Sequence, residues 1–504
     1  MKSVQKFDVF EYQLLCKTEP VATFICDGQV KVVNGFQTGS DGFAVRFMPE
    51  CEGVWKYHIS ADGVESAGEF TCVPNTDDNH GPVVAEGTRF RYADGTQYIP
   101  VGTTCYAWIH QPAELIAETL ETLKDTPFNK IRMCVFPKHM PYNQNEPMLY
   151  PFEKNADGKW DVNRPDERFW VHLEGCIGRL RNLGIEADLI LFHPYDRWGF
   201  SKLSMQDCLT FLDYCIRRLS AYRNIWWSLA NEYDLMPARS MEDWEAFGNK
   251  LHSQDLYQHL ISVHHCLRIY PKAPWMTHCS IQSGFVKRVA EWQREYGLPV
   301  MIDECGYEGN IEFDWGNLSA FEMVHRAWVT VANGGFITHG ETFFREDEVL
   351  WWAKGGKLYG QSPARFAFLK ALQYEIGDVE PLNRTFYQNP NDAPAEVTPE
   401  QSFIGLFASV MRSLPEFESR LLDMHFTPSV VRNEDHRLHY IGRQCPCRMD
   451  IQLPQNGNYK VEIIDVWEMT RETALAGAHG SIRVGLPGKE GIAVLVTRLY
   501  GDNL

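Results

Sequence analysis

Apolar and polar residues follow two different rhythms along this chain. Up to about residue 80, short runs alternate with a period of two, and turn-formers such as Asp27-Gly28 and Asn34-Gly35 separate them. These runs predict strands at residues 21–26, 29–33, 43–48, 54–60 and 69–73. A period of two with frequent turns is typical of an antiparallel sandwich, so residues 1–80 are predicted to form a small all-β domain.

From about residue 81, apolar runs alternate with amphipathic stretches. After a hairpin at residues 90–98, the runs predict strands at 99–104, 130–136, 185–192, 225–229, 260–264, 275–280, 299–302 and 335–338. Helical periodicity follows at 112–124, 169–182, 206–220, 244–254, 286–296, 321–333 and 363–374. Eight buried strands with intervening helices are typical of a (β/α)8 barrel, predicted here over residues 81–380.

The last part of the chain returns to the period of two. Four prolines among Asn and Asp residues predict a linker over residues 380–400. Strands are predicted beyond it at 403–410, 438–442, 449–453, 460–466, 481–486 and 492–497, giving a second sandwich over 400–504. The predicted fold class is therefore α/β, a (β/α)8 TIM barrel flanked by two small all-β sandwich domains.

Composition narrows the classes of partner. A formal net charge of -18 argues against nucleic acid, whose binding depends on Lys and Arg neutralising phosphates. No apolar run approaches the roughly 18 residues of a membrane helix, so no membrane partner is expected. The first residues lack the pattern of a secretory signal, which predicts a cytoplasmic protein. The 14 cysteines are too dilute for a disulfide scaffold and are expected to be reduced thiols.

Two of the apolar runs end abruptly in a glutamate. The fourth predicted strand runs into Asn231-Glu232, and the seventh runs into Asp303-Glu304. In a parallel barrel only the C-terminal ends of the strands open onto solvent, so carboxylates placed there can take part in chemistry. Two such glutamates are suited to the acid and the nucleophile of a retaining glycosidase. The alternative is that both are solvated loop residues.

The order of these motifs resembles that of clan A retaining glycoside hydrolases, in which Asn-Glu ends strand four and Glu ends strand seven. Residues 101–108, 45–55 and 459–470 are similar to the first barrel strand and the two flanking sandwiches of apiosidase-like enzymes. This resemblance implies that Glu232 is the general acid/base and Glu304 the nucleophile. It also implies that Asn231 binds the sugar hydroxyl next to the anomeric carbon, and that the substrate is a small saccharide or glycoside.

Further residues are expected around the two glutamates. Arg132 on the second strand could keep Glu304 ionised, because a nearby cation lowers a carboxyl pKa, or it could form a salt bridge in the barrel floor. His193 is suited to hydroxyl recognition, with a buried structural histidine as the alternative. Trp108 and one of the pair Trp351 and Trp352, with Trp351 preferred, are expected to stack on a sugar face.

A polar rim is expected from strands six and eight. It would consist of His278, Gln282, His339 and Glu341. Two features depart from the clan pattern: His278 occupies the region of the strand-six tyrosine, and His339-Gly340-Glu341-Thr342 replaces the strand-eight tryptophan. Glu341 would be a third acid near the mouth, and its role stays open.

Two other classes compete with the glycosidase. A metal-dependent hydrolase could use His193, His264 or His265, His278 and Asp303, but Thr103-Thr104-Cys105 stands where such barrels carry paired histidines. A non-catalytic carbohydrate-binding protein would suit the sandwiches and the aromatic residues, yet both expected acids are present.

The favoured hypothesis is an exo-acting retaining glycoside hydrolase without metal or cofactor, because a cytoplasmic enzyme would meet short imported oligosaccharides or glycosides. The sequence leaves open which sugar and linkage are cleaved. It also leaves open whether the sandwiches mediate a homo-oligomer.

Overall fold

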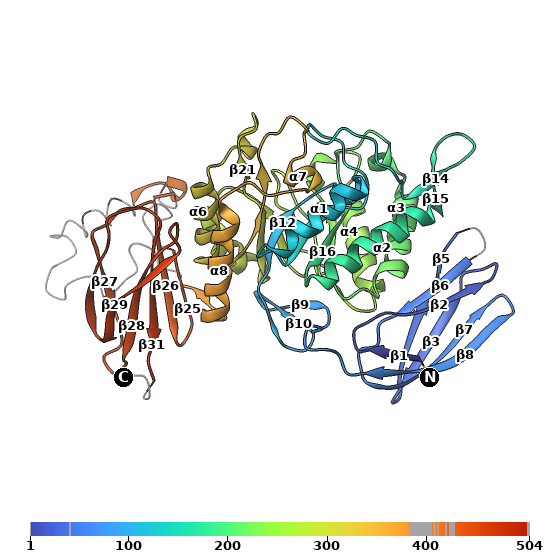
Figure 1. The fold of residues 1–504 in the computed structure, drawn as a ribbon, viewed down its shortest axis with the longest axis horizontal. Coiled ribbons are helices and arrows are strands. Elements are labelled where there is room, and N and C mark those ends of the chain that lie inside the picture. Colours follow the sequence, from blue (N-terminus) through green and yellow to red (C-terminus); the bar gives the residue numbers. More distant parts are fainter. Residues whose placement is uncertain are drawn as a thin grey trace. The chain divides into compact units, whose positions relative to one another are not determined.

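The N-terminal strands form two sheets in this computed structural model, which describes residues 2–39, 42–382, 406, 410, 413–418, 421–422 and 429–500 (Figure 1). One sheet has the order β1-β8-β7-β3-β4, and the other has the order β2-β6-β5. The strands are β1 Lys2–Gln5, β2 Phe10–Leu15, β3 Val21–Cys26, β4 Gln29–Asn34, β5 Phe36–Gln37, β6 Gly42–Phe47, β7 Gly53–Ala61 and β8 Val64–Val73.

Aromatic side chains fill the core of these two sheets. Phe24 and Phe47 stack with ring centroids 4.2 Å apart, and Phe10 and Phe70 stack at 4.5 Å. β1 and β2 are not among the predicted strands, although the sequence of β2 alternates as a strand should. β1 lies parallel to β8, and its four residues are too few to show a period.

Eight parallel strands form the central barrel sheet. Their order is β18-β17-β16-β13-β12-β22-β20-β19. An isolated parallel bridge links His264, two residues after β18, to Ser280 on β19, so the sheet is nearly closed. The strands are β12 Val101–Thr104, β13 Lys130–Cys134, β16 Glu186–Phe192, β17 Ile225–Ala230, β18 Ile261–Ser262, β19 Cys279–Gln282, β20 Val300–Glu304 and β22 Phe336–His339. The predicted barrel is confirmed.

Helices follow the barrel strands along the chain, and α1 to α4 lie beside them in Figure 1. Ser204 and Ser240 form capping boxes with Asp207 and Asp243, which explains where α3 and α4 begin. The α-helices are α1 Ala113–Lys124, α2 Glu167–Asn182, α3 Met205–Leu219, α4 Met241–Gln254, α5 Val289–Tyr296, α6 Ala320–Val331, α7 Trp351–Lys354 and α8 Ser362–Ile376. The 3-10 helices are η1 Trp108–His110, η2 Phe200–Lys202, η3 Tyr233–Leu235, η4 Val286–Arg288 and η5 Asp314–Gly316.

Three small sheets complete this part of the chain. They are β11-β10-β9, β14-β15 and β21-β23. Phe90 on β10 packs against Trp226, near the start of β17, with ring centroids 5.2 Å apart, which places this sheet at the N-terminal end of the barrel strands. The strands are β9 Val83–Glu86, β10 Arg89–Tyr92, β11 Gln97–Tyr98, β14 Phe152–Lys154, β15 Trp160–Pro165, β21 Glu308–Gly309 and β23 Glu341–Thr342.

The C-terminal strands form a six-stranded sheet, β24-β25-β26-β31-β28-β29, and a two-stranded sheet, β27-β30. The strands are β24 Glu380–Pro381, β25 Ser429–Arg432, β26 His436–Gly442, β27 Arg448–Gln452, β28 Tyr459–Asp465, β29 Thr470–Ala478, β30 Ser481–Gly485 and β31 Ile492–Arg498. Val461, Val484, Val494 and Val496 are among the apolar residues buried between them. The predicted linker at 380–400 and strand at 403–410 lie for the most part outside the described residues.

The chain divides into two compact units. The first comprises residues 1–284, 295–323 and 336–367, and the second comprises 285–294, 324–335 and 368–504. The barrel strands all belong to the first unit. The predicted domain boundaries at residues 80, 380 and 400 stay predictions.

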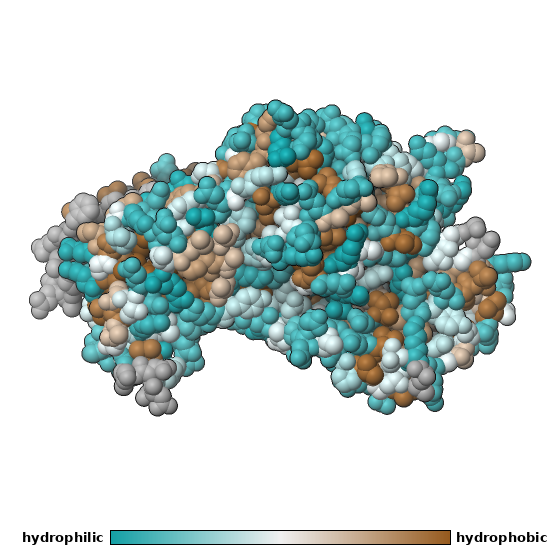
Figure 2. Space-filling model, in the orientation of Figure 1, coloured by the Kyte–Doolittle hydropathy of each residue, from teal (hydrophilic) through white to brown (hydrophobic). Residues whose placement is uncertain are grey.

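The surface seen in Figure 2 is largely hydrophilic, with separate apolar patches. Exposed apolar side chains on β3 and β4 include Ile25, Val30 and Val32. Within the described residues, no helix combines the length and the apolar character that crossing a bilayer requires.

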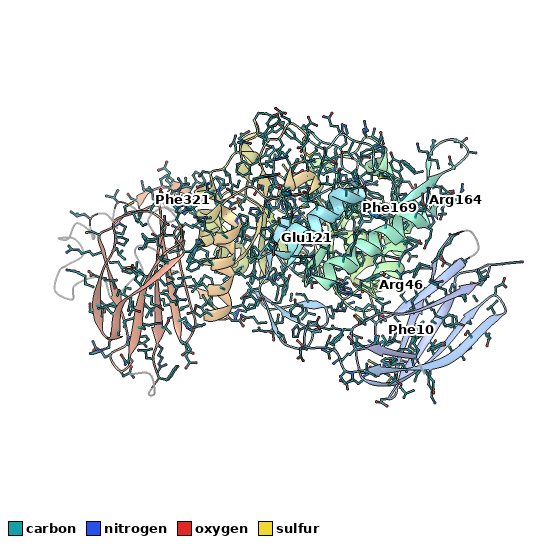
Figure 3. The ribbon with its side chains drawn as sticks, in the orientation of Figure 1. Phe10, Arg46, Glu121, Arg164, Phe169 and Phe321 are labelled. Carbon is teal, nitrogen blue, oxygen red and sulfur yellow. The ribbon has the colours of Figure 1, made fainter. Side chains whose placement is uncertain are left out.

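Arg46 on β6, labelled in Figure 3, belongs to a buried charge network with Glu174 on α2 and Arg218 on α3. Its Nη1 donates to Glu174 Oε1 at 2.5 Å and to the carbonyl oxygen of Arg218 at 2.8 Å. Arg218 Nε also donates to Glu174 Oε1, at 2.5 Å. Glu174 is therefore shared by two guanidinium groups, which are 7% and 1% exposed. Each of them also pairs with a second, less buried glutamate, Arg46 with Glu11 and Arg218 with Glu167.

Replacing Glu174 by alanine should strongly destabilise the protein. Two buried cations would lose their shared anion, and breaking a buried ion pair from one side costs about 3–5 kcal/mol. Urea unfolding followed by circular dichroism measures the loss. Replacing the exposed Glu65, which pairs with His58, should cost about 1 kcal/mol or less. Equal effects of the two substitutions would contradict a structural role for the network.

Candidate active site

Glu232 and Glu304, called the acid pair below, lie at the same end of the barrel. Glu304 is the last residue of β20, and Glu232 follows β17 after Asn231. The parallel strands bring these ends together, because neighbouring strands run in the same direction. Both glutamates and Asn231 line a single cavity of about 120 Å³. The structure thus brings together three of the predicted site residues.

The backbone of Glu232 adopts the left-handed conformation, with φ 53° and ψ 57°. A residue with a Cβ pays about 1–3 kcal/mol for such a conformation, and it persists only where the surroundings hold it. Here the N–H of Glu232 donates to Nδ1 of the buried His264 at 3.4 Å. Nε2 of the same ring lies 3.8 Å from Glu304 Oε1. His264 therefore touches both members of the acid pair.

Each member of the acid pair accepts a hydrogen bond from its own tyrosine. The hydroxyl of Tyr195 donates to Glu232 Oε2, and the hydroxyl of Tyr106 donates to Glu304 Oε1. The hydroxyl of Tyr307 lies 3.4 Å from that of Tyr106. Tyr106 follows β12, so the segment after the first barrel strand supplies the hydroxyl that contacts Glu304.

The surroundings of Glu304 act on its charge in opposite directions. Burial, followed by the negative charge of Glu232, raises the pKa of Glu304 to about 7, whereas Arg132, the Tyr106 hydroxyl and Lys138 favour the ionised form. Arg132 thus acts in the expected direction but is outweighed. Glu304 therefore becomes the carboxylate that can attack only as the pH rises through about 7.

Arg132 lies in the barrel interior rather than against Glu304. Its Nη2 donates to Asn231 Oδ1 at 3.0 Å, and its Nη1 lies 3.3 Å from Asp303 Oδ2. This is the salt bridge inside the barrel that sequence analysis left as the alternative. Arg132 orients the side chain of Asn231 toward the cavity.

The ion pairs below Asn231 form a closed set of charges. Lys130 Nζ lies 2.7 Å from both Asp188 Oδ2 and Asp303 Oδ1. Against the effect of burial, the positive charges of Lys130 and Arg132 hold the pKa of Asp303 well below its usual range. Two cations and two carboxylates balance one another, which gives the cavity a rigid polar floor.

Three residues that were predicted to contact the sugar, His193, Trp108 and Trp351, are buried and do not line the cavity. His193 Nε2 lies 3.1 Å from the carbonyl oxygen of Phe136, so the alternative of a buried histidine describes its environment. Trp108 is 0% exposed. Trp351 donates its Nε1 to Thr103 at 2.8 Å, and the next residue, Trp352, lines the cavity instead. On the short helix α7, adjacent side chains point in different directions, so only one of the two tryptophans can face a sugar.

His278 does not reach the predicted rim, because β19 begins one residue after it. The predicted strand covers residues 275–280, whereas β19 covers Cys279–Gln282. His278 therefore lies at the N-terminal end of the barrel, packed against Phe90 and Trp226. Burial lowers its pKa to about 3. Gln282, at the other end of the strand, does line the cavity.

His339 and Glu341 also lie outside the cavity lining. The His339 ring stacks on Phe128 with centroids 4.9 Å apart. Glu341 accepts the N–H groups of Tyr359 and Gly360 at 2.6 and 2.8 Å, so it anchors the segment that leads into α8. Burial raises the pKa of Glu341 to about 7. The predicted third acid of the mouth is thus an anchor for the backbone.

The metal-dependent alternative requires at least three ligand residues whose side chains lie close together. Within the described residues, the one such group is Glu308, His339 and Glu341. Glu308 accepts the N–H groups of Gln361 and Ser362, at 2.8 and 3.0 Å. None of the residues of the metal hypothesis belongs to this group, so the structure does not bring that ligand set together.

Most of the cavity lining was not predicted. Asn231, Glu232, Gln282 and Glu304 were predicted, and Trp352 was the less preferred of its pair. The lining residues that were not predicted are Tyr106, Lys138, Met140, Tyr195, Gly306, Tyr307 and Trp315. All of them lie in segments that follow barrel strands, and this position could have identified them from the sequence. Tyr106 stands inside the motif at 101–108, but the pattern favoured Trp108, two residues further on.

Three family descriptions match this chain. The description "Apiosidase-like, catalytic domain" covers residues 85–365. Domains of unknown function match on either side, DUF5060 over residues 3–62 and DUF5605 over residues 424–497. A search of curated proteins gave no match.

Solved structures resemble the chain over most of its length. A protein from Bacteroides vulgatus ATCC 8482, named as a candidate glycoside hydrolase, is 32% identical, covers 99% of this chain and 100% of its own, and has a TM-score of 0.85. A structure named glycoside hydrolase has 14% identity, 84% and 98% coverage, and a TM-score of 0.59. A glycoside hydrolase family 5 protein from Bacteroides vulgatus ATCC 8482 has 14% identity, 84% and 95% coverage, and a TM-score of 0.57. The last two show the fold alone.

The barrel and its acid pair place the chain in the class of proteins with the clan A glycoside hydrolase fold. Within that class, the chain belongs to the apiosidase-like family.

Proposed function

We propose that this chain is a retaining glycosidase that releases a terminal sugar from short oligosaccharides or glycosides. The observation that carries the proposal is the convergence of Glu232, Glu304 and Asn231 on one small cavity. A double displacement requires a carboxylate that attacks and a carboxylic acid that protonates, with a sugar between them. The apiosidase-like description makes apiosides the first glycosides to test.

In the first step of the proposed reaction, Glu304 attacks the anomeric carbon while Glu232 donates its proton to the leaving oxygen. The glycosidic C–O bond breaks, and an ester joins the sugar to Glu304. In the second step, Glu232 takes a proton from water, whose oxygen attacks the anomeric carbon and releases Glu304. Asn231 accepts and donates hydrogen bonds at the neighbouring sugar hydroxyl, a contact that strengthens as positive charge develops on the ring.

The size of the cavity supports exo-action. Its volume of about 120 Å³ is small beside the roughly 300–1,000 Å³ of ligand pockets in general. This is room for one sugar ring rather than for a run of them. Trp315 and Trp352 supply flat apolar surface for the C–H face of such a ring.

A panel of nitrophenyl glycosides and short oligosaccharides, assayed with and without a chelator, tests this proposal. We expect one terminal sugar to be released, at a rate that the chelator does not change. The first product seen by NMR should have the same anomeric configuration as the substrate. An inverted product, internal cleavage, or loss of activity with the chelator would contradict the proposed mechanism. Sugar binding without turnover would favour the carbohydrate-binding alternative.

Replacing Tyr106 by phenylalanine should raise the pH below which activity is lost. Glu304 attacks as a carboxylate, so activity falls as pH drops through its pKa of about 7. The Tyr106 hydroxyl favours ionised Glu304, so its removal raises this pKa and moves the acidic limb of kcat/KM to higher pH. We also expect kcat/KM to fall by about 10-fold, because a hydrogen bond to a charged group is lost.

A matched control for this substitution is Tyr98→Phe. The Tyr98 hydroxyl donates to the carbonyl oxygen of Asn129 at 2.8 Å, away from the cavity. Its removal should leave the pH profile unchanged. An acidic limb that stays in place or moves to lower pH in Tyr106→Phe would show that this hydroxyl does not act on Glu304.

A further inference from the structure

Lys138 places an ammonium group in the cavity without an anionic partner of its own. It lines the cavity together with the acid pair, and the residue is 4% exposed. In the part of the chain that the structure describes, no hydrogen bond or ion pair involves its side chain. A buried ammonium with three N–H donors is costly unless something accepts them.

Aromatic rings hold this ammonium in place. Lys138 Nζ lies 3.7 Å from the ring centroid of Tyr106, 4.4 Å from that of Tyr195 and 5.2 Å from that of Trp352. Ring faces attract a cation and offset part of its lost hydration, but they accept no directed N–H···O hydrogen bond. Tyr106 and Tyr195 are the residues that hold Glu304 and Glu232. The cage therefore fixes Lys138 beside both carboxyl groups, with its donors unused by protein acceptors.

The charges in the cavity decide which ligand suits these donors. Burial lowers the pKa of Lys138, and the negative charges of Glu304 and Glu232 oppose this effect. The same two carboxyl groups would repel a sugar that carries a carboxylate or a sulfate, because all the groups share about 120 Å³. Hydroxyl oxygens of a neutral sugar can accept the N–H groups of Lys138 without that repulsion.

We infer that this cavity binds a neutral sugar and that Lys138 anchors it, by donating hydrogen bonds to hydroxyl oxygens of the ring held at the acid pair. The inference rests on the proposed function in taking the ligand to be a sugar. It goes further by naming the substrate class and the residue that holds it. Sites built to hydrogen-bond a substrate hydroxyl discriminate strongly against ligands that lack it.

Calorimetric titration of the full-length protein tests the inference without requiring turnover. The probes are the free neutral sugars xylose, arabinose, apiose, galactose and glucose, and the uronic acids glucuronate and galacturonate. We expect the wild type to bind at least one neutral sugar, and to bind it more tightly than either uronate. In Lys138→Met, which keeps the length of the side chain, the Kd for that sugar should rise by about 10-fold to 100-fold.

Two further variants separate binding from folding. Lys138→Arg keeps the charge and the N–H donors, so it should bind the sugar more tightly than Lys138→Met. Lys124→Met removes an exposed lysine that pairs with Glu121, and it should leave the Kd unchanged. Thermal unfolding of each variant shows whether the fold is retained. If Lys138→Met does not fold, the inference is tested by comparing the affinities of Lys138→Arg and the wild type for the deoxy forms of the bound sugar.

The inference is overturned if Lys138→Met binds the sugar as the wild type does, if a uronate binds more tightly than every neutral sugar, or if no sugar of the panel binds. In the deoxy series, it is overturned if no single hydroxyl deletion removes the difference between Lys138→Arg and the wild type. These outcomes are independent of the proposed reaction, which is judged by turnover and by substitution of the acid pair. A protein that binds neutral sugars through Lys138 but shows no turnover would refute only the proposed hydrolysis.

Discussion

Replacing Glu304 by glutamine is expected to abolish formation of the glycosyl-enzyme and to lower kcat/KM by about 10⁴-fold or more. Glutamine has nearly the same volume and can still contact Tyr106, so the cavity should keep its shape. Its neutral amide cannot attack the anomeric carbon, however, and the first step of the double displacement stops. Steady-state kinetics on the best aryl glycoside of the panel measure the loss.

The identity of the nucleophile can be tested directly on the wild-type protein. A 2-deoxy-2-fluoro glycoside of the same sugar slows both steps, so the covalent intermediate accumulates. Peptide mapping by mass spectrometry should then find the added sugar on Glu304. A label on Glu232 would reverse the two roles. Glu121→Gln, an exposed substitution on α1 (Figure 3), should change neither kcat/KM nor labelling.

Replacing Glu232 by alanine is expected to separate substrates by their leaving groups. General acid catalysis contributes about 10²-fold to 10⁴-fold, and this contribution matters most where the leaving oxygen is basic. For an alkyl glycoside or an oligosaccharide, kcat/KM should fall by about that factor. For a dinitrophenyl glycoside, whose leaving group departs without a proton, the loss in the first step should be small.

Comparison of the two substrates within each variant provides the control. Glu304→Gln should lose activity on both, because the nucleophile is needed whatever the leaving group. Glu232→Ala should also accumulate the glycosyl-enzyme from the dinitrophenyl substrate, since no base activates the water of the second step. Equal losses on both substrates in Glu232→Ala would show that this residue is not the acid/base.

The amino-acid pattern predicted the barrel and the position of its acid pair. A buried parallel strand is apolar along its length, so the point at which the apolar run stops is visible in the sequence. The end of the apolar run also places Glu232 and Glu304 in the fold, because all eight strands end at the same mouth of the barrel. Asn231 follows from the same reasoning. No knowledge of side-chain packing was needed for these three residues.

The other predicted site residues depended on information that a linear pattern lacks. For His278, an error of a few residues in the predicted start of β19 placed the side chain at the C-terminal end of the barrel, whereas it lies at the N-terminal end. For Trp351 and Trp352, the helix direction decided which ring faces the cavity. Glu341 was correctly placed after a strand, but its carboxylate turns to the N–H groups of Tyr359 and Gly360.

By itself the sequence determined the fold class and the strand ends that carry Glu232 and Glu304, because periodicity and the position of an apolar run are local properties of the chain. Only the tertiary structure decided that Tyr106, Tyr195 and Lys138 surround them. These three side chains come from different loops, and their directions depend on packing between segments that are distant in sequence.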